Sequence, residues 1–95
     1  MRHNLKILPE YYEAVLDGTK TFEMRYNDRN FQVGDILRLR EYQPMTDEYE
    51  ARYTGRDIEV VITYILPLFD VIDNIRYVLP ESYVIMSIKK MPAAG

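Results

Sequence analysis

At residues 18–25 the chain reads Gly-Thr-Lys-Thr-Phe-Glu-Met-Arg, and within this stretch the hydrophobic pattern changes from helical to alternating. Before it, residues 9–17 begin with Pro9, which suits the first turn of a helix, and Gly18 is a typical residue just after a helix end. From Thr19 onward the side chains alternate with a period of two, as in a strand. The stretch therefore predicts a helix that leads directly into a strand. The predicted apolar face of the helix consists of Tyr12, Val15 and Leu16.

Four other segments have the alternation or the β-branched composition of strands, namely residues 4–8, 36–42, 57–65 and 83–88. Residues 43–56 are polar and acidic and contain Pro44 and Gly55, so we expect a hairpin connection there. A short helix is expected near residues 69–78, and residues 91–95 are expected to form a flexible tail. Five or six strands with one helix between the first two describe an α+β, mainly β fold, whose sheet curls into a small closed or half-closed barrel.

The length and composition predict one globular domain. A chain of 95 residues is below the size at which a single core splits, so we assign residues 1–90 to one domain. The apolar fraction is 47%, and nine tyrosines and three phenylalanines supply side chains large enough to fill a small interior. These values exclude a disordered chain.

Several kinds of chemistry are excluded by composition. The chain has no cysteine and one histidine, so thiol catalysis, thiolate zinc and multi-histidine metal sites are ruled out, and we expect no cofactor. No apolar run reaches the roughly 18 residues that cross a bilayer, and the N-terminal residues do not resemble a secretory signal. We therefore expect a cytoplasmic protein with no membrane partner.

The charge is distributed unevenly. The net charge of −3 argues against a sequence-independent grip on duplex DNA, which depends on neutralising several phosphates. Residues 1–40 nevertheless hold seven Lys/Arg against six Asp/Glu, whereas residues 41–95 hold five against nine. A local basic surface on the N-terminal half is compatible with this distribution.

The strand after Gly18 supplies the candidate site. Glu23 and Arg25 are two residues apart, so they project from the same face of a strand with Cα atoms roughly 7 Å apart, opposite Phe22 and Met24. Lys20 has the other parity, but a turn after the helix can direct it to the same cleft. The alternative is that Glu23 and Arg25 form a solvated ion pair of about 0 to 1 kcal/mol.

The same residues carry a family resemblance. Gly18-Thr19-Lys20-Thr21-Phe22-Glu23-Met24-Arg25 resembles the Gly-x-Lys-x-x-Glu-x-Arg signature of ASCH domains, which have the PUA-like fold. The chain is most similar to DUF3850, a short ASCH-like family of bacteria and their phages. Further segments that carry the similarity, which spans about residues 3–88, are Leu5-Lys6-Ile7-Leu8-Pro9-Glu10-Tyr11, Phe31-Gln32-Val33-Gly34-Asp35-Ile36-Leu37 and Tyr53-Thr54-Gly55-Arg56.

The resemblance implies a PUA-like barrel that binds RNA or a nucleotide, with the signature lining a cleft beside the helix. Lys20 and Arg25 would hold a phosphate or a base oxygen, and Glu23 would accept from an exocyclic amine. Thr21 lies within the signature and is included among the ligand-binding candidates.

Other side chains extend this prediction. Tyr26 and Tyr83 are candidate stacking platforms for unpaired bases, the alternative being tyrosines of the core or rim. His3 is expected to be an ordinary histidine near the terminus. A possible basic surface comprises Lys6, Arg29, Arg38 and Arg40, although Arg38 and Arg40 share a strand face opposite Leu37 and Leu39 that a solvated outer surface also explains.

Two other functions remain open. Some small ASCH proteins are amidohydrolases that act on N4-acetylcytidine through a Lys, a Thr and a Glu, and the resemblance would give Lys20 and Glu23 the catalytic positions. Their strand reads Lys-Thr-x-Thr, and Glu23 stands where the second threonine would be. Their catalytic glutamate comes from a later segment, where this chain offers Asp70, Asp73 or Glu81.

The second alternative is a phage protein that blocks a host protein through the acidic residues 47–50.

Overall fold

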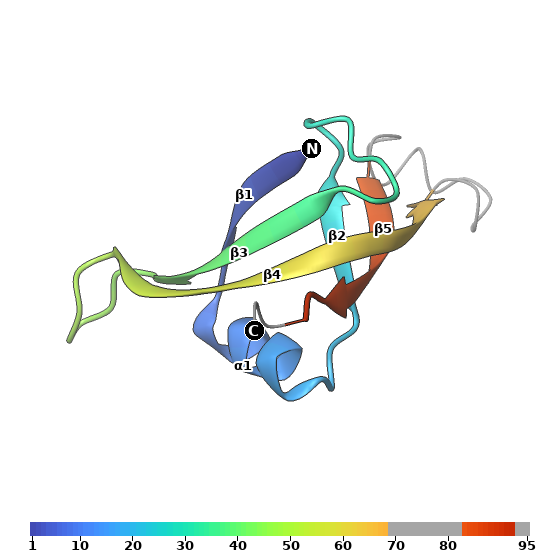
Figure 1. Ribbon diagram of the computed structural model, residues 1–95. Coiled ribbons are helices and arrows are strands. Elements are labelled where there is room, and N and C mark those ends of the chain that lie inside the picture. The colour runs from blue at the N-terminus through green and yellow to red at the C-terminus, as the bar shows by residue number, and fades with distance from the viewer. Residues whose placement is uncertain (69–82, 93–95) are drawn as a thin grey trace.

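The computed structural model describes residues 1–68 and 83–92. In this part of the chain, one helix and five strands follow in the order β1 (Arg2–Ile7), α1 (Pro9–Asp17), β2 (Phe22–Tyr26), β3 (Ile36–Gln43), β4 (Arg52–Pro67) and β5 (Tyr83–Lys90), as Figure 1 shows. The helix predicted near residues 69–78 and the candidates Asp70, Asp73 and Glu81 lie outside the described residues.

The helix has the predicted ends. Pro9 occupies its first turn, and Glu10 places a negative charge at the end where the helix dipole favours one. Gly18 closes it in the left-handed conformation with φ of 87°, and its N–H donates to the Val15 carbonyl at 3.2 Å. Tyr12 and Val15 are buried as predicted, but Leu16 is 42% exposed, so the buried face is narrower than expected.

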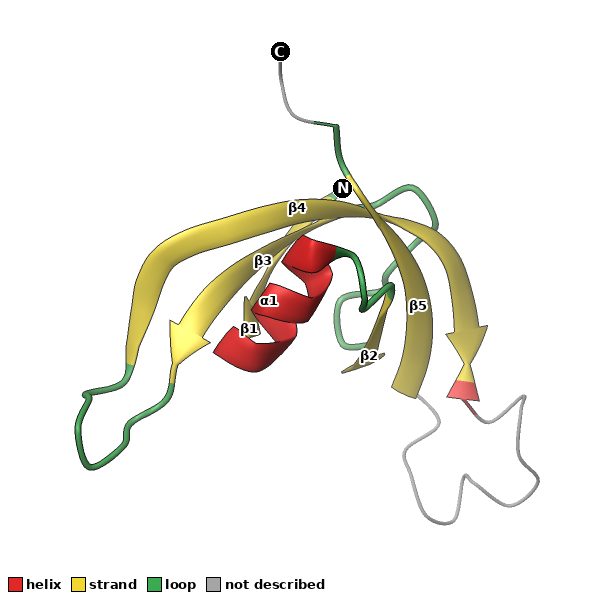
Figure 2. Cartoon of the chain, turned by 90° about the horizontal axis from the view of Figure 1, so that it is seen from below, coloured by secondary structure: helices red, strands yellow, loops and turns green. Residues whose placement is uncertain are grey.

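The sheet has the strand order β1-β3-β4-β5-β2. β1 pairs parallel with β3, and the β3–β4, β4–β5 and β2–β5 pairs are antiparallel. The sheet curls into a half-barrel, with α1 lying on its concave side (Figure 2). This arrangement confirms the predicted mainly β fold with one helix between the first two strands. β1 and β2 are therefore the two edges of the sheet.

The core lies between the helix and the concave face of the sheet. Alternate residues of the central strands are fully buried, namely Leu37, Leu39, Val60, Ile62 and Met86. In β3 the intervening side chains Arg38 and Arg40 point the other way and are partly exposed. The period-two pattern therefore identified both faces of this strand correctly.

The prediction that residues 43–56 form a hairpin connection was wrong at both ends, because Gln43 belongs to β3 and residues 52–56 belong to β4. Tyr42 pairs with Tyr53, and after a register shift Arg40 pairs with Asp57. The shift leaves three residues of β4 opposite one of β3, and Gly55 takes a φ of 95° within this bulge. A glycine there interrupts the sequence pattern of a strand without ending the strand.

The ends of the other elements differ by a few residues. β1 covers Arg2–Ile7 where residues 4–8 were expected, and β2 begins at Phe22 where Thr19 was expected. β5 continues two residues past the predicted end to Lys90. No helical segment within residues 1–68 and 83–92 has the length and apolar character needed to cross a bilayer.

Candidate functional site

The candidate site is built around Glu23, whose carboxylate is held by two cations. Glu23 Oε1 accepts from Lys20 Nζ, and Glu23 Oε2 accepts from Arg25 Nε at 2.9 Å. The Glu23 side chain is 4% exposed, whereas the side chains of Lys20 and Arg25 are 16% and 27% exposed. We call these three residues the clamp. The structure brings them together as the sequence suggested; their role in ligand binding stays a prediction.

Backbone geometry directs the two cations to this place. The Lys20 N–H donates to the Ala14 carbonyl at 2.9 Å, which ties the residue to the last turn of α1, and Lys20 Nζ donates to the Phe22 carbonyl at 2.6 Å. Arg25 Nη2 donates to the Lys6 carbonyl at 2.8 Å. Since β1 and β2 are the edges of the sheet, this last bond joins the two edges of the half-barrel.

The inward face of β2 is the charged one. Glu23 is buried, while Phe22 and Met24 on the other face are each 50% exposed. A buried carboxylate is tolerated where both its oxygens have cationic donors, as they have here. The apolar side chains of β2 are therefore available at the surface beside the clamp.

A cavity of about 590 Å³ lies over the clamp; we call it the clamp cavity. Its walls come from the end of β1, the start of α1 and β2, with the lining residues Lys6, Ile7, Leu8, Tyr11, Lys20, Phe22, Glu23, Met24 and Arg25. The ring centroids of Phe22 and Tyr11 lie 5.0 Å and 5.8 Å from Lys20 Nζ. Aromatic rings thus stand beside a cation at the cavity wall.

The clamp cavity suits an anion that carries an apolar or aromatic group. Among the described residues, three cations line it, Lys6, Lys20 and Arg25, against the single carboxylate of Glu23. Within residues 1–68 and 83–92, Lys20 uses two of its three N–H donors and Arg25 two of its five, which leaves donors on both side chains for a ligand. Because each oxygen of Glu23 already accepts from a cation, its main effect is to orient Lys20 and Arg25.

The remaining predicted ligand residues lie around the clamp rather than in it. Thr21 lines a second, mostly apolar cavity of about 330 Å³ beside the end of α1, which shares only Lys20 with the clamp cavity among the described residues. Tyr26 and Tyr83 are register partners whose rings meet edge to face at 5.6 Å between centroids. Tyr26 also lines a cavity of about 210 Å³ with Arg25 and Asp28.

The predicted basic surface divides into two parts. Lys6, Arg29 and Arg40 line a cavity of about 280 Å³ that adjoins the clamp cavity. Arg38 lies farther out on β3, where its Nη2 donates to Asp57 Oδ2 at 2.8 Å. The carboxylate of Asp57 raises the pKa of Arg38.

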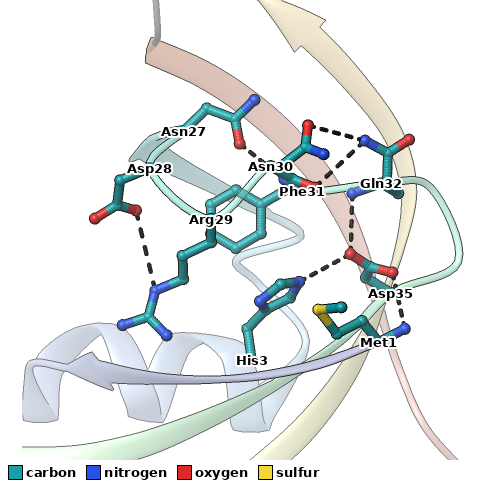
Figure 3. Close-up of polar contacts among 9 residues, drawn as sticks. All are labelled: Met1, His3, Asn27, Asp28, Arg29, Asn30, Phe31, Gln32 and Asp35. Carbon is teal, nitrogen blue, oxygen red and sulfur yellow. Dashed lines mark hydrogen bonds and ion pairs between the residues drawn. The ribbon is translucent and has the colours of Figure 1, made fainter.

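The prediction for His3 was wrong. His3 is buried, its Nε2 lies 2.8 Å from Asp35 Oδ2, and its ring meets Phe31 edge to face, as Figure 3 shows. Asp35 also accepts from the Gln32 backbone N–H and from the Met1 amine, each at 3.0 Å. The hydrogen bond to His3 is the main cause that lowers the pKa of Asp35 to about 2, against the opposing effect of burial. This cluster fastens the start of β1 to the turn before β3.

A second ion cluster, centred on the buried Glu41, was not foreseen. Arg56 donates from Nε and Nη2 to the buried carboxylate of Glu41 at 2.9 and 2.8 Å, and also pairs with Glu13 of α1. Thr54 adds a 2.6 Å hydrogen bond to Glu41, and Arg56 is the main cause that lowers the pKa of Glu41. The sequence segment that marks this cluster is Tyr53-Thr54-Gly55-Arg56. In the structure, Thr54 and Arg56 of this segment bind Glu41 of β3, and Arg56 also joins β4 to Glu13 of α1.

Sequence reasoning also missed the apolar walls of the clamp cavity. Tyr11 and Leu8 come from the start of α1, and Phe22 and Met24 come from β2. All four are large apolar side chains at least 39% exposed, which is a recognisable sign of a binding surface once exposure is known. Alternation alone placed Phe22 and Met24 on one face without showing that this face is outward.

Comparison with known proteins gives three results. Residues 2–88 match the family described as "Domain of unknown function (DUF3850)". An "Uncharacterized 12.9 kDa protein in GpA 3'region" of Escherichia phage P2 is 36% identical over 77 residues, which is 81% of this chain and 63% of the relative, so the chain spans less than two thirds of that protein. The crystal structure of hypothetical protein PH0355 matches 96% of this chain and 100% of its own with a TM-score of 0.58 at 17% identity, which indicates a shared fold.

Proposed function

Because this chain belongs to the DUF3850 family, whose description assigns no function, we propose from the site itself that the protein binds RNA or a nucleotide in the clamp cavity. The observation that carries the proposal is the combination of three cations, one shared carboxylate and exposed aromatic rings around one cavity of about 590 Å³. A nucleotide presents both of the groups that these walls would accept, an anionic phosphate and a flat base.

Each wall has a part in this proposal. Lys20 and Arg25 provide N–H donors for the phosphate, and Lys6 adds a third positive charge to the cavity wall. Tyr11 and Phe22, half exposed, offer faces on which a base stacks, a contact worth about 1–3 kcal/mol per base. Glu23 fixes the direction of the two cations, so less side-chain entropy is lost when the ligand binds.

The resemblance of residues 18–25 to the ASCH signature supports the same proposal. Gly18 ends the helix, and the other three fixed positions of that signature, Lys20, Glu23 and Arg25, form the clamp at one cavity. We propose that the half-barrel is an ASCH domain of the PUA-like type and that its ligand is a nucleic-acid component.

Calorimetric titration with the four ribonucleoside 5′-monophosphates and with short single-stranded RNA tests the proposal. Lys6→Gln is the most informative variant, because it removes a cavity cation without disturbing the bonds of Glu23. We expect it to weaken binding about tenfold, as for the loss of one charge-assisted hydrogen bond. Lys20→Gln should weaken binding further.

The matched control is Lys89→Gln, which removes a positive charge from a residue that does not line the clamp cavity. Equal affinities for the wild type, Lys6→Gln and Lys20→Gln would refute the proposal. Release of acetate from N4-acetylcytidine by the wild type would replace it with the amidohydrolase alternative. Binding that depends on Asp47, Glu48 and Glu50 rather than on the clamp would favour a protein partner.

A further inference from the structure

A second basic cavity adjoins the clamp cavity. It measures about 280 Å³, and we call it the basic cavity. It shares the lining residues Lys6 and Arg25 with the clamp cavity, so the two cavities are neighbours separated by a common wall. Its lining within the described part of the chain includes four cations and no carboxylate: Asn4, Leu5, Lys6, Arg25, Arg29, Arg40 and Tyr53.

Aromatic rings rather than carboxylates hold two of these cations. The guanidinium carbon of Arg40 lies 3.9 Å from the ring centroid of Tyr53, and Lys6 Nζ lies 4.4 Å from that of Tyr42. Tyr42 and Tyr53 in turn meet edge to face with centroids 5.2 Å apart. Lys6 and Arg40 are register partners on β1 and β3, so both cations project from neighbouring strands.

Their positive charge is not neutralised. Among residues 1–68 and 83–92, neither Lys6 nor Arg40 forms an ion pair with a carboxylate. Asp57 is the register partner of Arg40, but its carboxylate is bonded to Arg38. Arg29 Nε lies 4.0 Å from Asp28 Oδ1, which is a weak ion pair. A cation held by a ring keeps its charge and its donors while its conformation is restricted, which is the state that suits phosphate recognition.

The chemistry of the two cavities differs. The clamp cavity has the exposed faces of Tyr11 and Phe22, whereas in the basic cavity Arg40 covers one face of Tyr53. The first therefore suits a base together with its phosphate, and the second suits a phosphate alone. In an oligonucleotide, each nucleotide is followed along the backbone by the phosphate of the next one. Because the two cavities share a wall, one oligonucleotide can place adjacent phosphates in both.

We propose that the protein binds a single-stranded oligonucleotide rather than a free nucleotide, with the phosphate next to the bound nucleotide held in the basic cavity by Arg40, Arg29 and Lys6. This inference rests on the function proposed above and adds the class of ligand. The positions of Arg40 and Arg29 outside the clamp cavity allow the two proposals to be tested separately.

The test compares each ribonucleoside 5′-monophosphate with the tetranucleotide of the same base, as RNA and as DNA, by calorimetry at several salt concentrations. The variants are Arg40→Gln and Arg29→Gln, and Arg2→Gln is the control because Arg2 pairs with Glu59 and lines neither cavity. Thermal unfolding of each variant checks the fold. The RNA and DNA arms identify which strand carries the phosphate.

We expect the wild type to bind tetranucleotides more tightly than monophosphates. Arg40→Gln should weaken tetranucleotide binding about tenfold and leave monophosphate binding within about twofold. The slope of log affinity against log salt should fall by about 0.7, the value for one lost phosphate contact to a single strand. Arg29→Gln should act in the same direction, and Arg2→Gln should change neither affinity.

Three results would overturn the inference. The first is a tetranucleotide affinity no greater than that of the monophosphate, the second is an unchanged salt slope in Arg40→Gln, and the third is an equal loss for both ligands. Each of these leaves the proposed nucleotide site standing if monophosphates still bind. A wild type that binds neither ligand would refute the proposed function as well.

Discussion

Glu23→Gln is expected to destabilise the protein by about 2 kcal/mol. The substitution keeps the shape of the side chain but removes the charge that both Lys20 and Arg25 contact. A hydrogen bond to a charged group contributes about 1.5–3 kcal/mol, and breaking a fully buried ion pair costs about 3–5 kcal/mol. Lys20 and Arg25 are 16% and 27% exposed, so water compensates part of the loss, and the estimate stays at about 2 kcal/mol.

Each cation also keeps a second partner in the variant. Lys20 still donates to the Phe22 carbonyl and Arg25 to the Lys6 carbonyl. For a domain of this size, about 2 kcal/mol corresponds to a fall in Tm of roughly 10 °C. Thermal and urea unfolding followed by circular dichroism measure the change, with Glu48→Gln at an exposed position of the β3–β4 connection as the matched control.

The two variants must differ for the reasoning to hold. If Glu23→Gln unfolds at the same temperature and urea concentration as Glu48→Gln and the wild type, the carboxylate does not contribute through its cations, and the description of the clamp as a stabilised unit is wrong. A higher stability of Glu23→Gln would show that the free-energy cost of burying the charge exceeds the stabilisation from its interactions with Lys20 and Arg25.

Three further outcomes are expected. The pKa of Asp35 is lowered from 3.8 to about 2, so its carboxylate should stabilise the fold by about 2 kcal/mol above about pH 4, and this stabilisation is lost as the pH falls toward 2. The free energy of unfolding of Asp35→Asn, measured with urea, should therefore be lower than that of the wild type at pH 6 and approach it near pH 2. Arg56→Ala should lose about 2 kcal/mol in the same assay, because it leaves the buried carboxylate of Glu41 without its bidentate partner, and Arg56→Lys should restore only part of this. Gly18→Ala should cost about 1 kcal/mol through its φ of 87° alone, since no atom of the described residues lies within 4 Å of the added methyl group, and an unchanged urea midpoint would show that the turn relaxes.

Local patterns predicted the local elements well. Pro9 and Gly18 set both ends of α1, because helix ends depend on residues at the ends themselves. The alternation of Leu37 and Leu39 with Arg38 and Arg40 identified the two faces of β3. In both cases the controlling interactions lie within a few residues of one another.

The errors arose where distant residues decide the structure. His3 is buried because Asp35, 32 positions along the chain, accepts its hydrogen bond. The continuation of β4 through Gly55 depends on pairing with β3 across a bulge. Neither contact leaves a periodic signal in the sequence, so both were missed.

The candidate site was predicted in part. The positions of Lys20, Glu23 and Arg25 around one cavity follow from a helix end and a pleated strand, both of which the sequence indicates. The aromatic wall was not predicted, because the direction in which β2 turns its apolar face depends on the edge-to-edge arrangement of β1 and β2. The ring contacts of Arg40 and Lys6 likewise require the register of three strands.

The claim that the clamp cavity binds a nucleotide is tested most directly by amide chemical shifts. A titration of isotope-labelled protein with ribonucleoside 5′-monophosphates and short RNA would be followed by heteronuclear NMR. The account predicts that the largest shifts occur at Tyr11, Lys20, Phe22 and Arg25, with saturable concentration dependence. Shifts that are absent, or that concentrate on residues 44–51 of the β3–β4 connection, would contradict it.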